Sequence, residues 1–212
     1  MTAVWKIMTL KSGEFTVDKS LETLNKDIGV KMKIPVLSIA VFSEAGKILV
    51  DTGVADPDWV NRDVAPFHQR NEERMDAALK SGLGWKPEEI DFVINTHLHH
   101  DHCANNKLFK NAKFIIQRNE WQYAFDPLPM HKSIYQQDYF GKGAVNYFAW
   151  EQIEGEEEII SGIKVFYTPG HTKGHQSVLV NTVEGPVCIA GDACNLVENI
   201  EEMLPPSITT SS

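Results

Sequence analysis

The stretch "THLHHDH" at residues 96–102 places four histidines and one aspartate within seven positions. The whole chain has eight histidines, so half of them fall in this one run. Imidazole nitrogens and carboxylate oxygens are both good ligands for zinc and similar divalent ions. The run directly follows an apolar segment, residues 91–95, that reads as a buried strand. The sequence therefore predicts a metal site in the loop after a strand.

The spacing within this run suits two ions better than one. His97 and His99 are two residues apart, so a short loop can direct both imidazoles at the same ion. Asp101 and His102, turned the other way, can serve a second ion. The alternative is a polar loop with chance histidines, and the position directly after an apolar strand disfavours it.

Length and composition indicate a single folded domain, and the charge disfavours binding to nucleic acid. A chain of 212 residues with 42% hydrophobic content can bury a core, which predicts a single domain over residues 1–212. The formal net charge is -9, and no cluster of Lys and Arg suits a phosphate backbone. We therefore expect no nucleic-acid partner.

The same sequence predicts a cytoplasmic protein without a membrane partner. No apolar run has the length needed to span a bilayer. Lysines at positions 6 and 11 interrupt the N-terminal stretch, which does not read as a secretory signal. Three sparse cysteines do not make a disulfide framework.

Two segments share one pattern that predicts a β-hairpin followed by an aspartate. Residues 35–53 contain an apolar run, a turn at 44–46, a second apolar run and then Asp51. Residues 177–193 repeat this order, with a turn at 184–186 and Asp192 after the second run. The recurrence predicts a duplicated, β-rich layout.

Helices and strands alternate in the rest of the chain. We expect a helix at 71–80, a strand at 91–95, a strand and helix within 112–125, and a strand leading into a Pro-Gly loop within 162–172. Residues 126–160 are predicted to form a lid-like insertion or a loop with short helices. Because histidines and aspartates follow strand ends, the pattern indicates an α/β protein with its site at those ends.

Four motifs together carry a family resemblance. They are "ILVDTG" (48–53), "DFVINTHLHHDHCANN" (91–106), "YTPGHTKGHQS" (167–177) and "IAGDA" (189–193). In order and spacing the chain resembles the metallo-β-lactamase superfamily, and within it the N-acyl-homoserine lactonase-like branch. The resemblance extends from about residue 34 to residue 200. It implies an α/β fold, a four-layer αββα sandwich, with a metal site at one edge.

The resemblance also implies a set of ligands for two divalent metal ions, zinc in the first place. One ion would be held by His97, His99 and His171, and the second by Asp101 and His102, with Asp192 bridging both. A metal-bound hydroxide between them would attack the substrate carbonyl. The Asp101 carboxylate would carry the proton to the leaving group.

Other polar residues near the motifs receive supporting roles. The resemblance implies that Asp51 and His175 support the ligands by hydrogen bonds, although a plain structural role for His175 stays open. His100 is expected to face the substrate or to be exposed. His131 has no partner in the sequence, which favours the surface or a pocket rim.

The chain departs from the family pattern in two places that concern the site. Lactonases of this kind place a tyrosine three residues after the bridging aspartate, whereas this chain has Asn195, a shorter donor for the substrate carbonyl. No histidine follows His175, although the family's second site takes one more from near the C-terminus. The resemblance therefore implies a missing C-terminal helix and strand, a second metal site that is weak or empty, and a possible homodimer.

These observations favour a metal-dependent hydrolase that opens a lactone or related ester, and hence a quorum-quenching role. Its partner would be a small-molecule acyl ester or lactone. Two alternatives stay open. One is a thioesterase resembling glyoxalase II, and the other is a C-terminally shortened metal-binding protein without catalysis.

Overall fold

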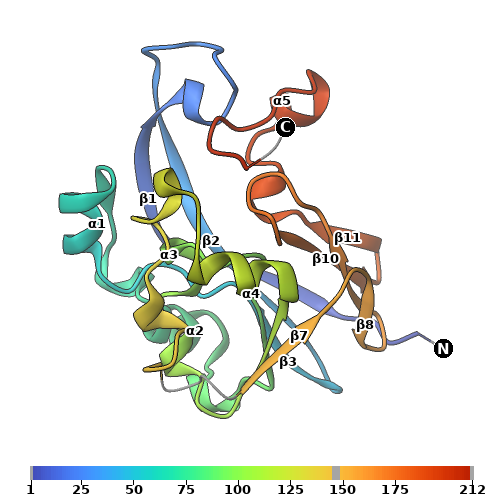
Figure 1. Cartoon of the computed structure of the whole chain (residues 1–212). Coiled ribbons are helices and arrows are strands. Elements are labelled where there is room, and N and C mark those ends of the chain that lie inside the picture. The colour runs from blue at the N-terminus through green and yellow to red at the C-terminus, as the bar shows by residue number, and fades with distance from the viewer. Residues whose placement is uncertain (1, 145–148, 211–212) are drawn as a thin grey trace.

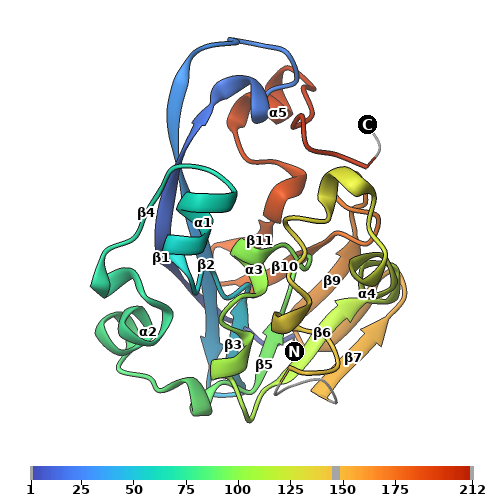
Figure 2. The same cartoon turned by 60° about the vertical axis from the view of Figure 1, so that its left-hand side comes forward.

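Two β-sheets pack face to face in the computed structural model, which describes residues 2–144 and 149–210 (Figures 1 and 2). The seven-stranded sheet has the order β4 (Phe67–His68), β1 (Lys6–Asp18), β2 (Lys31–Ser43), β3 (Gly46–Val50), β5 (Phe92–Ile94), β6 (Lys113–Gln117) and β7 (Trp150–Ile153). The four-stranded sheet has the order β11 (Gly185–Ile189), β10 (Gln176–Thr182), β9 (Ile163–Tyr167) and β8 (Glu157–Ile160). The α-helices are α1 (Pro57–Asp63), α2 (Met75–Leu83), α3 (His100–Cys103), α4 (Arg118–Phe125) and α5 (Val197–Glu201).

An apolar core fills the space between the two sheets. It joins Val41 and Ile94 of the large sheet to Val165 and Val178 of the small sheet, and all four are fully buried. These residues alternate with outward-facing ones along each strand, as the pleat requires. Burial of this kind is the main term that holds the sheets together.

Helices cover the outer face of the large sheet. Leu79 of α2 packs with Leu49 of β3 and Phe114 of β6 in a second apolar cluster. Further along that sheet, Ala124 of α4 packs against Ile116 in a third cluster. The order of layers on this side is therefore helix, sheet, sheet.

Both predicted hairpins are present. Strand β2 pairs antiparallel with β3, and Ser43 lies opposite Gly46 across the turn. Strand β10 pairs in the same way with β11, where Thr182 lies opposite Gly185. The second turn lies about one residue earlier than predicted, because Pro186 already pairs with Asn181.

Several element boundaries differ from the sequence prediction. The long strand β1, which pairs with β2 along most of its length, was not predicted. The helix expected from residue 71 begins as α2 at Met75, because residues 71–73 form a separate 3-10 turn. The insertion at 126–160 contains 3-10 helices at Pro129–His131 and Gln137–Tyr139 and then β7 and β8, while residues 145–148 lie outside the described residues.

Parallel pairing brings the strand-end motifs to one edge. Strands β3, β5, β6 and β7 run parallel to one another. Their carboxyl ends therefore lie at the same edge of the sheet, where "DTG" follows β3 and "NTHLHHDH" follows β5. This edge is where the metal site was predicted.

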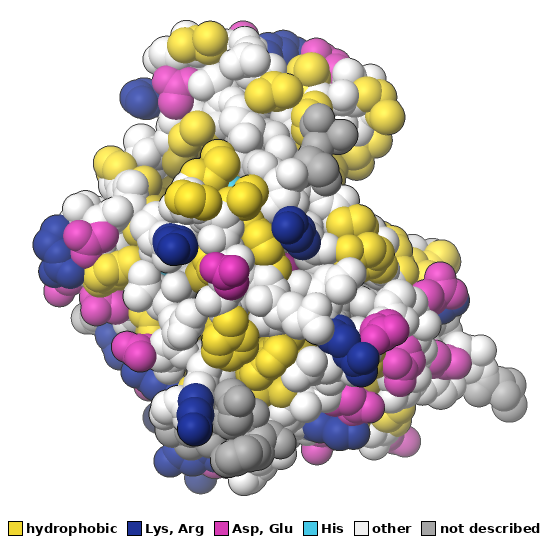
Figure 3. Space-filling model, viewed as in Figure 1, with side chains coloured by type: hydrophobic (Ala, Val, Ile, Leu, Met, Phe, Trp, Pro, Cys, Tyr) yellow, Lys and Arg dark blue, Asp and Glu magenta, His cyan; other side chains and the backbone are white. Residues whose placement is uncertain are grey.

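The connection between β1 and β2 rises above the sheets and meets α5 (Figure 1). Asn199 of α5 donates its Nδ2 hydrogen to the carbonyl oxygen of Glu22 in that connection, at 2.7 Å. Apolar side chains gather on the upper part of the molecule in Figure 3. The β1–β2 connection and the segment around α5 expose five of them: Leu21, Leu24, Val197, Ile200 and Met203. Among the described residues, no helix has the length and apolar character that a membrane crossing needs.

We expect Leu79→Ala to lower the free energy of unfolding by about 2–5 kcal/mol, because it leaves a cavity where α2 packs on the large sheet. Lys80→Ala, on the exposed side of the same helix, should change it by no more than about 0.5 kcal/mol. Urea unfolding of the three proteins measures both values. Equal effects of the two substitutions would contradict the packing described for α2.

Candidate metal centre

Four loops converge at the strand-end edge. They follow β3, β5, β9 and β11, and they carry Asp51, the 96–102 run, His171 and Asp192. Six of the predicted ligands lie here together: His97, His99, Asp101, His102, His171 and Asp192. The fold thus brings His97 and Asp192, which are 95 positions apart in the chain, into one group of side chains.

The first group of ligand atoms consists of three imidazole nitrogens. His97 Nε2 lies 2.9 Å from His99 Nδ1, and His171 Nε2 lies 3.0 Å from the same atom. Tetrahedral ligands at zinc–nitrogen distances of about 2.0–2.1 Å lie about 3.3 Å apart. The observed spacing is close to this value, so the three nitrogens surround one point where a divalent ion fits.

The outer nitrogens of His97 and His171 are held by acceptors, which leaves their inner nitrogens as lone-pair donors, whereas the outer nitrogen of His99, Nε2, has no hydrogen-bond partner among the described residues. His171 Nδ1 donates to the carbonyl oxygen of Ile208 at 2.8 Å. His97 Nδ1 donates to Thr96 Oγ1 at 3.0 Å, because that hydroxyl itself donates to Asp51. This pairing is the one by which proteins fix the tautomer of metal-binding histidines.

The second group contains one imidazole and two carboxylates. Asp192 places Oδ1 at 3.3 Å from His102 Nε2 and Oδ2 at 3.5 Å from His171 Nε2. Its two oxygens therefore face the two groups separately, as a bridging carboxylate would. Asp101 Oδ2 lies 3.6 Å from His102 Nε2 on the other side.

Burial and neighbouring charges separate the two groups electrostatically. Burial lowers the pKa of His97 and His99 well below the usual range, and the surrounding histidines add to this effect. Both rings are thus neutral near pH 7, which is the state that binds a metal. At His102 burial lowers the pKa, but the carboxylates of Asp192 and Asp101 outweigh it and raise the pKa well above its usual value. The second group therefore favours positive charge.

Asp51 contacts the ligand loop through three hydrogen bonds. Its Oδ2 accepts a hydrogen bond from His102 Nδ1 at 2.8 Å and another from Thr96 Oγ1 at 2.7 Å. Its Oδ1 accepts from the backbone N–H of Thr96 at 2.8 Å. Asp51 has a φ of 58°, a left-handed conformation that aspartate tolerates better than most residues. The carboxylate thereby orients His102 without pointing at the ligand groups.

His175 also contacts the site by hydrogen bonds. Its Nδ1 bonds to Thr168 Oγ1 at 2.8 Å, and its Nε2 accepts from the backbone N–H of Asp192 at 3.1 Å. Gly191 passes so close that a Cβ there would lie 2.7 Å from His175 Nε2. His175 therefore fixes the loop that carries the carboxylate of Asp192.

Glu120 of α4 is a supporting residue that the sequence analysis missed. Its fully buried carboxylate accepts from the backbone N–H of Leu98 at 3.0 Å, between the first two histidines. It also accepts from Thr172 Oγ1 and from the N–H of Gly174, just past His171. One carboxylate thus joins the two loops that supply the first group of ligands. A lone glutamate in an amphipathic helix gives no spacing signal, so the pattern could not reveal it.

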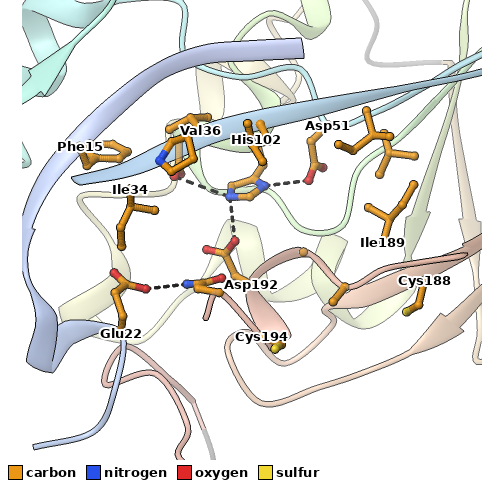
Figure 4. Close-up of a pocket in the computed structure, with 18 of the residues that line it drawn as sticks. Phe15, Glu22, Ile34, Val36, Asp51, His102, Cys188, Ile189, Asp192 and Cys194 are labelled. Atoms are coloured by element: carbon orange, nitrogen blue, oxygen red, sulfur yellow. Dashed lines mark hydrogen bonds and ion pairs between the residues drawn. The ribbon is translucent and has the colours of Figure 1, made fainter. Parts of the chain in front are cut away.

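Asn195 lies beside the ligand groups but is already bonded. Its Nδ2 donates to Oε2 of Glu22 at 2.7 Å, so this hydrogen bond occupies one of its two amide donor hydrogens (Figure 4). Asn195 and Glu22 line two cavities that meet at Asp101 and Asp192. The larger, of about 440 Å³, runs between β2 and β11, and the smaller, of about 200 Å³, lies under Ile134 and Ile208.

Two histidines outside the ligand set differ from expectation. His131 was expected at the surface or a pocket rim, but it is buried. The hydroxyl of Tyr123 forms a hydrogen bond with its Nδ1 at 2.9 Å, and the two rings pack edge to face. His100 is buried as well, which excludes the exposed alternative. Its ring packs against Trp59 and lines the smaller cavity, in agreement with the substrate-facing alternative.

The chain belongs to the metallo-β-lactamase superfamily, whose family model matches residues 33–210. A curated relative, the N-acyl homoserine lactonase of Bacillus cereus, is 32% identical over 95% of this chain and 81% of its own length. The lactonase AttM of Agrobacterium fabrum is 28% identical over 98% of this chain and 83% of its own length. The homologues are thus hydrolases that act on ester bonds.

Solved structures agree with these relatives. A quorum-quenching N-acyl homoserine lactone lactonase has a TM-score of 0.84 and 29% identity, covering 100% of this chain and 83% of its own. Another such hydrolase, with the product N-hexanoyl-L-homoserine at its catalytic metal centre, has a TM-score of 0.83 at 29% identity, covering 100% and 84%. The predicted α/β metallo-β-lactamase fold is confirmed.

We expect Glu120→Gln to weaken binding of the first metal equivalent by about tenfold or more. Gln cannot accept from all the donors that now meet the carboxylate, so the loops carrying His99 and His171 separate. Chelator competition measures the affinity. Glu73→Gln is the matched control, because Glu73 is equally buried but bonds to Arg70 and Lys11. Both variants should lose about 1–3 kcal/mol of stability, and equal metal affinities would contradict the role of Glu120.

The metal-stripped protein should lose stability as the pH falls below about 6.5. Burial lowers the pKa of His175 to about 3, whereas an unfolded histidine titrates near 6.5, so between these values the unfolded chain binds the extra proton. Urea unfolding from pH 7 to 4 measures the slope. His175→Gln should reduce it by up to about 1.4 kcal/mol per pH unit, whereas substitution of exposed His68 should leave it unchanged. A wild-type slope in His175→Gln would contradict the burial of a neutral ring.

Proposed function

We propose that this protein is a metal-dependent lactonase that hydrolyses N-acyl homoserine lactones. The observation that carries the proposal is Asp192, whose two oxygens face two separate groups of ligand atoms at the meeting point of two apolar cavities. The names of its relatives and solved neighbours support the same substrate class. Destruction of such signals would make it a quorum-quenching enzyme.

We assign one divalent ion to His97, His99 and His171, and a second to Asp101 and His102, with Asp192 between them. Ions bound there supply Lewis acidity for the lactone carbonyl and acidify the water that attacks it. Zinc is our first choice of metal, because nitrogen-rich tetrahedral sets suit it. The group of Asp101, His102 and Asp192 offers fewer nitrogens, so the second ion should bind more weakly.

Two side chains at the site, Asp101 and Asn195, would transfer the proton and position the substrate. Asp101 has 20% of its side chain exposed and, unlike Asp192, faces only the second group. It can accept the proton of the attacking water and pass it to the departing ring oxygen. Asn195 keeps one amide hydrogen beyond the bond to Glu22 and can direct it at the substrate.

Apolar walls would hold the acyl chain and exclude water. Phe15 and Val17 of β1 line both cavities, and Ile34 of β2 and Ile189 of β11 line the larger one (Figure 4). Each buried methylene of a substrate chain contributes about 0.8 kcal/mol of binding. These walls therefore favour substrates with an alkyl chain.

The charges of the cavities favour a neutral lactone over an anionic thioester of the glyoxalase II type. Glu22, Asp101 and Asp192 line both cavities, and among their described lining residues there is no Lys or Arg. A glutathione-like leaving group carries carboxylates, which need cationic partners when they leave water. The lactone alternative is therefore preferred.

Two finer assignments complete the proposal. The three cysteines are free thiols, which supports a cytoplasmic location. The exposed apolar side chains of the β1–β2 connection and α5 fit the predicted homodimer, which stays a prediction.

The zinc-loaded protein should bind two metal equivalents and hydrolyse N-hexanoyl-homoserine lactone, with little turnover of a glutathione thioester. Titration of the released acid at constant pH measures the rate. His97→Ala should lower kcat/KM by at least about a hundredfold, because it removes a direct ligand rather than an outer partner. His68→Ala is the control, and a chelator should abolish activity. One metal equivalent or none, without turnover, would favour the non-catalytic metal-binding alternative.

A further inference from the structure

We propose that Glu22 is a specificity-determining residue that accepts a hydrogen bond from an amide N–H beside the scissile carbonyl of the substrate. The inference rests on the proposed lactonase function and extends it. Glu22 would make the enzyme prefer lactones that carry an acylamino group on the carbon next to the carbonyl over lactones that carry only an alkyl chain there.

Glu22 lines the cavities through which a substrate would reach the metal centre. It belongs to the connection between β1 and β2, and it lines both cavities together with Asp101 and Asp192. Figure 4 shows it on the side of the pocket next to Asp192. A molecule that enters through either cavity and reaches the ligand groups therefore meets this carboxylate.

The position of Glu22 is fixed by its backbone. Its N–H donates to the carbonyl oxygen of Lys19 at 3.0 Å, and its own carbonyl accepts from Asn199 Nδ2 at 2.7 Å. The first bond belongs to the short 3-10 turn, and the second ties that turn to α5. Because the backbone N–H and C=O of Glu22 are both hydrogen-bonded, its side chain can orient a ligand at small entropic cost.

The carboxylate of Glu22 has one oxygen in use and one available. Oε2 accepts from Asn195 Nδ2 at 2.7 Å. Within residues 2–144 and 149–210, no donor is bonded to Oε1 and no Lys or Arg pairs with the side chain. Burial raises the pKa of Glu22, and the negative charges of Asp192 and Asp101 add to that effect.

This combination points to a hydrogen-bond donor on the ligand. Oε1 is the open acceptor of a half-buried carboxylate that lines the cavities, so a ligand that brings an N–H to it can form a charge-assisted hydrogen bond. Among the described residues that line both cavities, Glu22 and Asn195 are the polar ones outside the ligand groups. In an N-acyl amino lactone the amide nitrogen is attached to the carbon next to the reacting carbonyl, so its N–H reaches the same side of the centre.

Two substrates that differ at one position test the inference. They are N-hexanoyl-homoserine lactone and the analogue in which a CH2 group replaces the amide N–H. The wild type should show a kcat/KM about ten- to hundredfold higher for the amide, the effect of one charge-assisted hydrogen bond. Glu22→Ala should reduce this ratio to about one, because the effect of releasing Asn195 is common to both substrates and cancels in the ratio.

Two further variants separate recognition from loss of the pocket wall. Glu22→Gln keeps one acceptor oxygen in the same place and should retain part of the preference. Leu21→Ala removes an apolar neighbour that lines the smaller cavity, and it should lower both rates equally with the ratio unchanged. A Glu22→Ala enzyme that keeps the wild-type ratio, or that loses both activities together, would overturn the inference.

Failure of the lactonase function has a different signature. Wild-type protein that hydrolyses neither lactone would refute the proposed function, and calorimetric binding of the same two compounds then decides on Glu22. Tighter binding of the amide that disappears in Glu22→Ala would still support the inference. Equal binding of both compounds to the wild type would overturn it.

Discussion

Two buried carboxylates, Asp51 and Glu120, hold the ligand loops in the positions on which the site depends. Asp51 follows β3 and bonds to Thr96 and His102, so it joins the end of β3 to the loop after β5. Glu120 joins that loop to the one after β9 by accepting three hydrogen bonds from the two loops, and Tyr135 donates a fourth. Buried charges of this kind are tolerated only when their acceptor capacity is filled. The loops that fill it are the loops that carry the histidines, so the same bonds satisfy the carboxylates and place the metal ligands.

The ligand rings gain from this arrangement in a second way. Three of them donate an outer N–H to an acceptor, and each has its other nitrogen facing the ligand groups. Without those acceptors a buried imidazole would place a proton toward the centre as readily as a lone pair. Burial lowers the pKa of His97 and His99, and this favours the neutral, metal-binding form. The fold therefore prepares the centre electrostatically as well as geometrically.

Sequence patterns predicted the parts of the structure that depend on local spacing. The two hairpins and the strand before the histidine run could be inferred, because each rests on a short motif. The convergence of His171 with that run was implied only by the family resemblance. The strand β1 could not, since charged residues interrupt its apolar alternation and its partner β2 supplies the pairing. Glu120 and Glu22 were missed for a related reason. Their roles arise from contacts with residues far along the chain, and nothing in the neighbouring sequence marks them.

Asn195 illustrates how such distant contacts can change the meaning of a motif position. By spacing from Asp192 it takes the place where the resembled lactonases have a tyrosine, and it was expected to be a shorter donor for the substrate carbonyl. The structure commits one of its amide hydrogens to Glu22, a residue 173 positions earlier. A tyrosine hydroxyl could not donate to both a carboxylate and a substrate, whereas an amide has two donor hydrogens. Under the proposed function, the shorter side chain at position 195 would let a donor and an acceptor face the same substrate, and this pairing would make the β1–β2 connection part of the site.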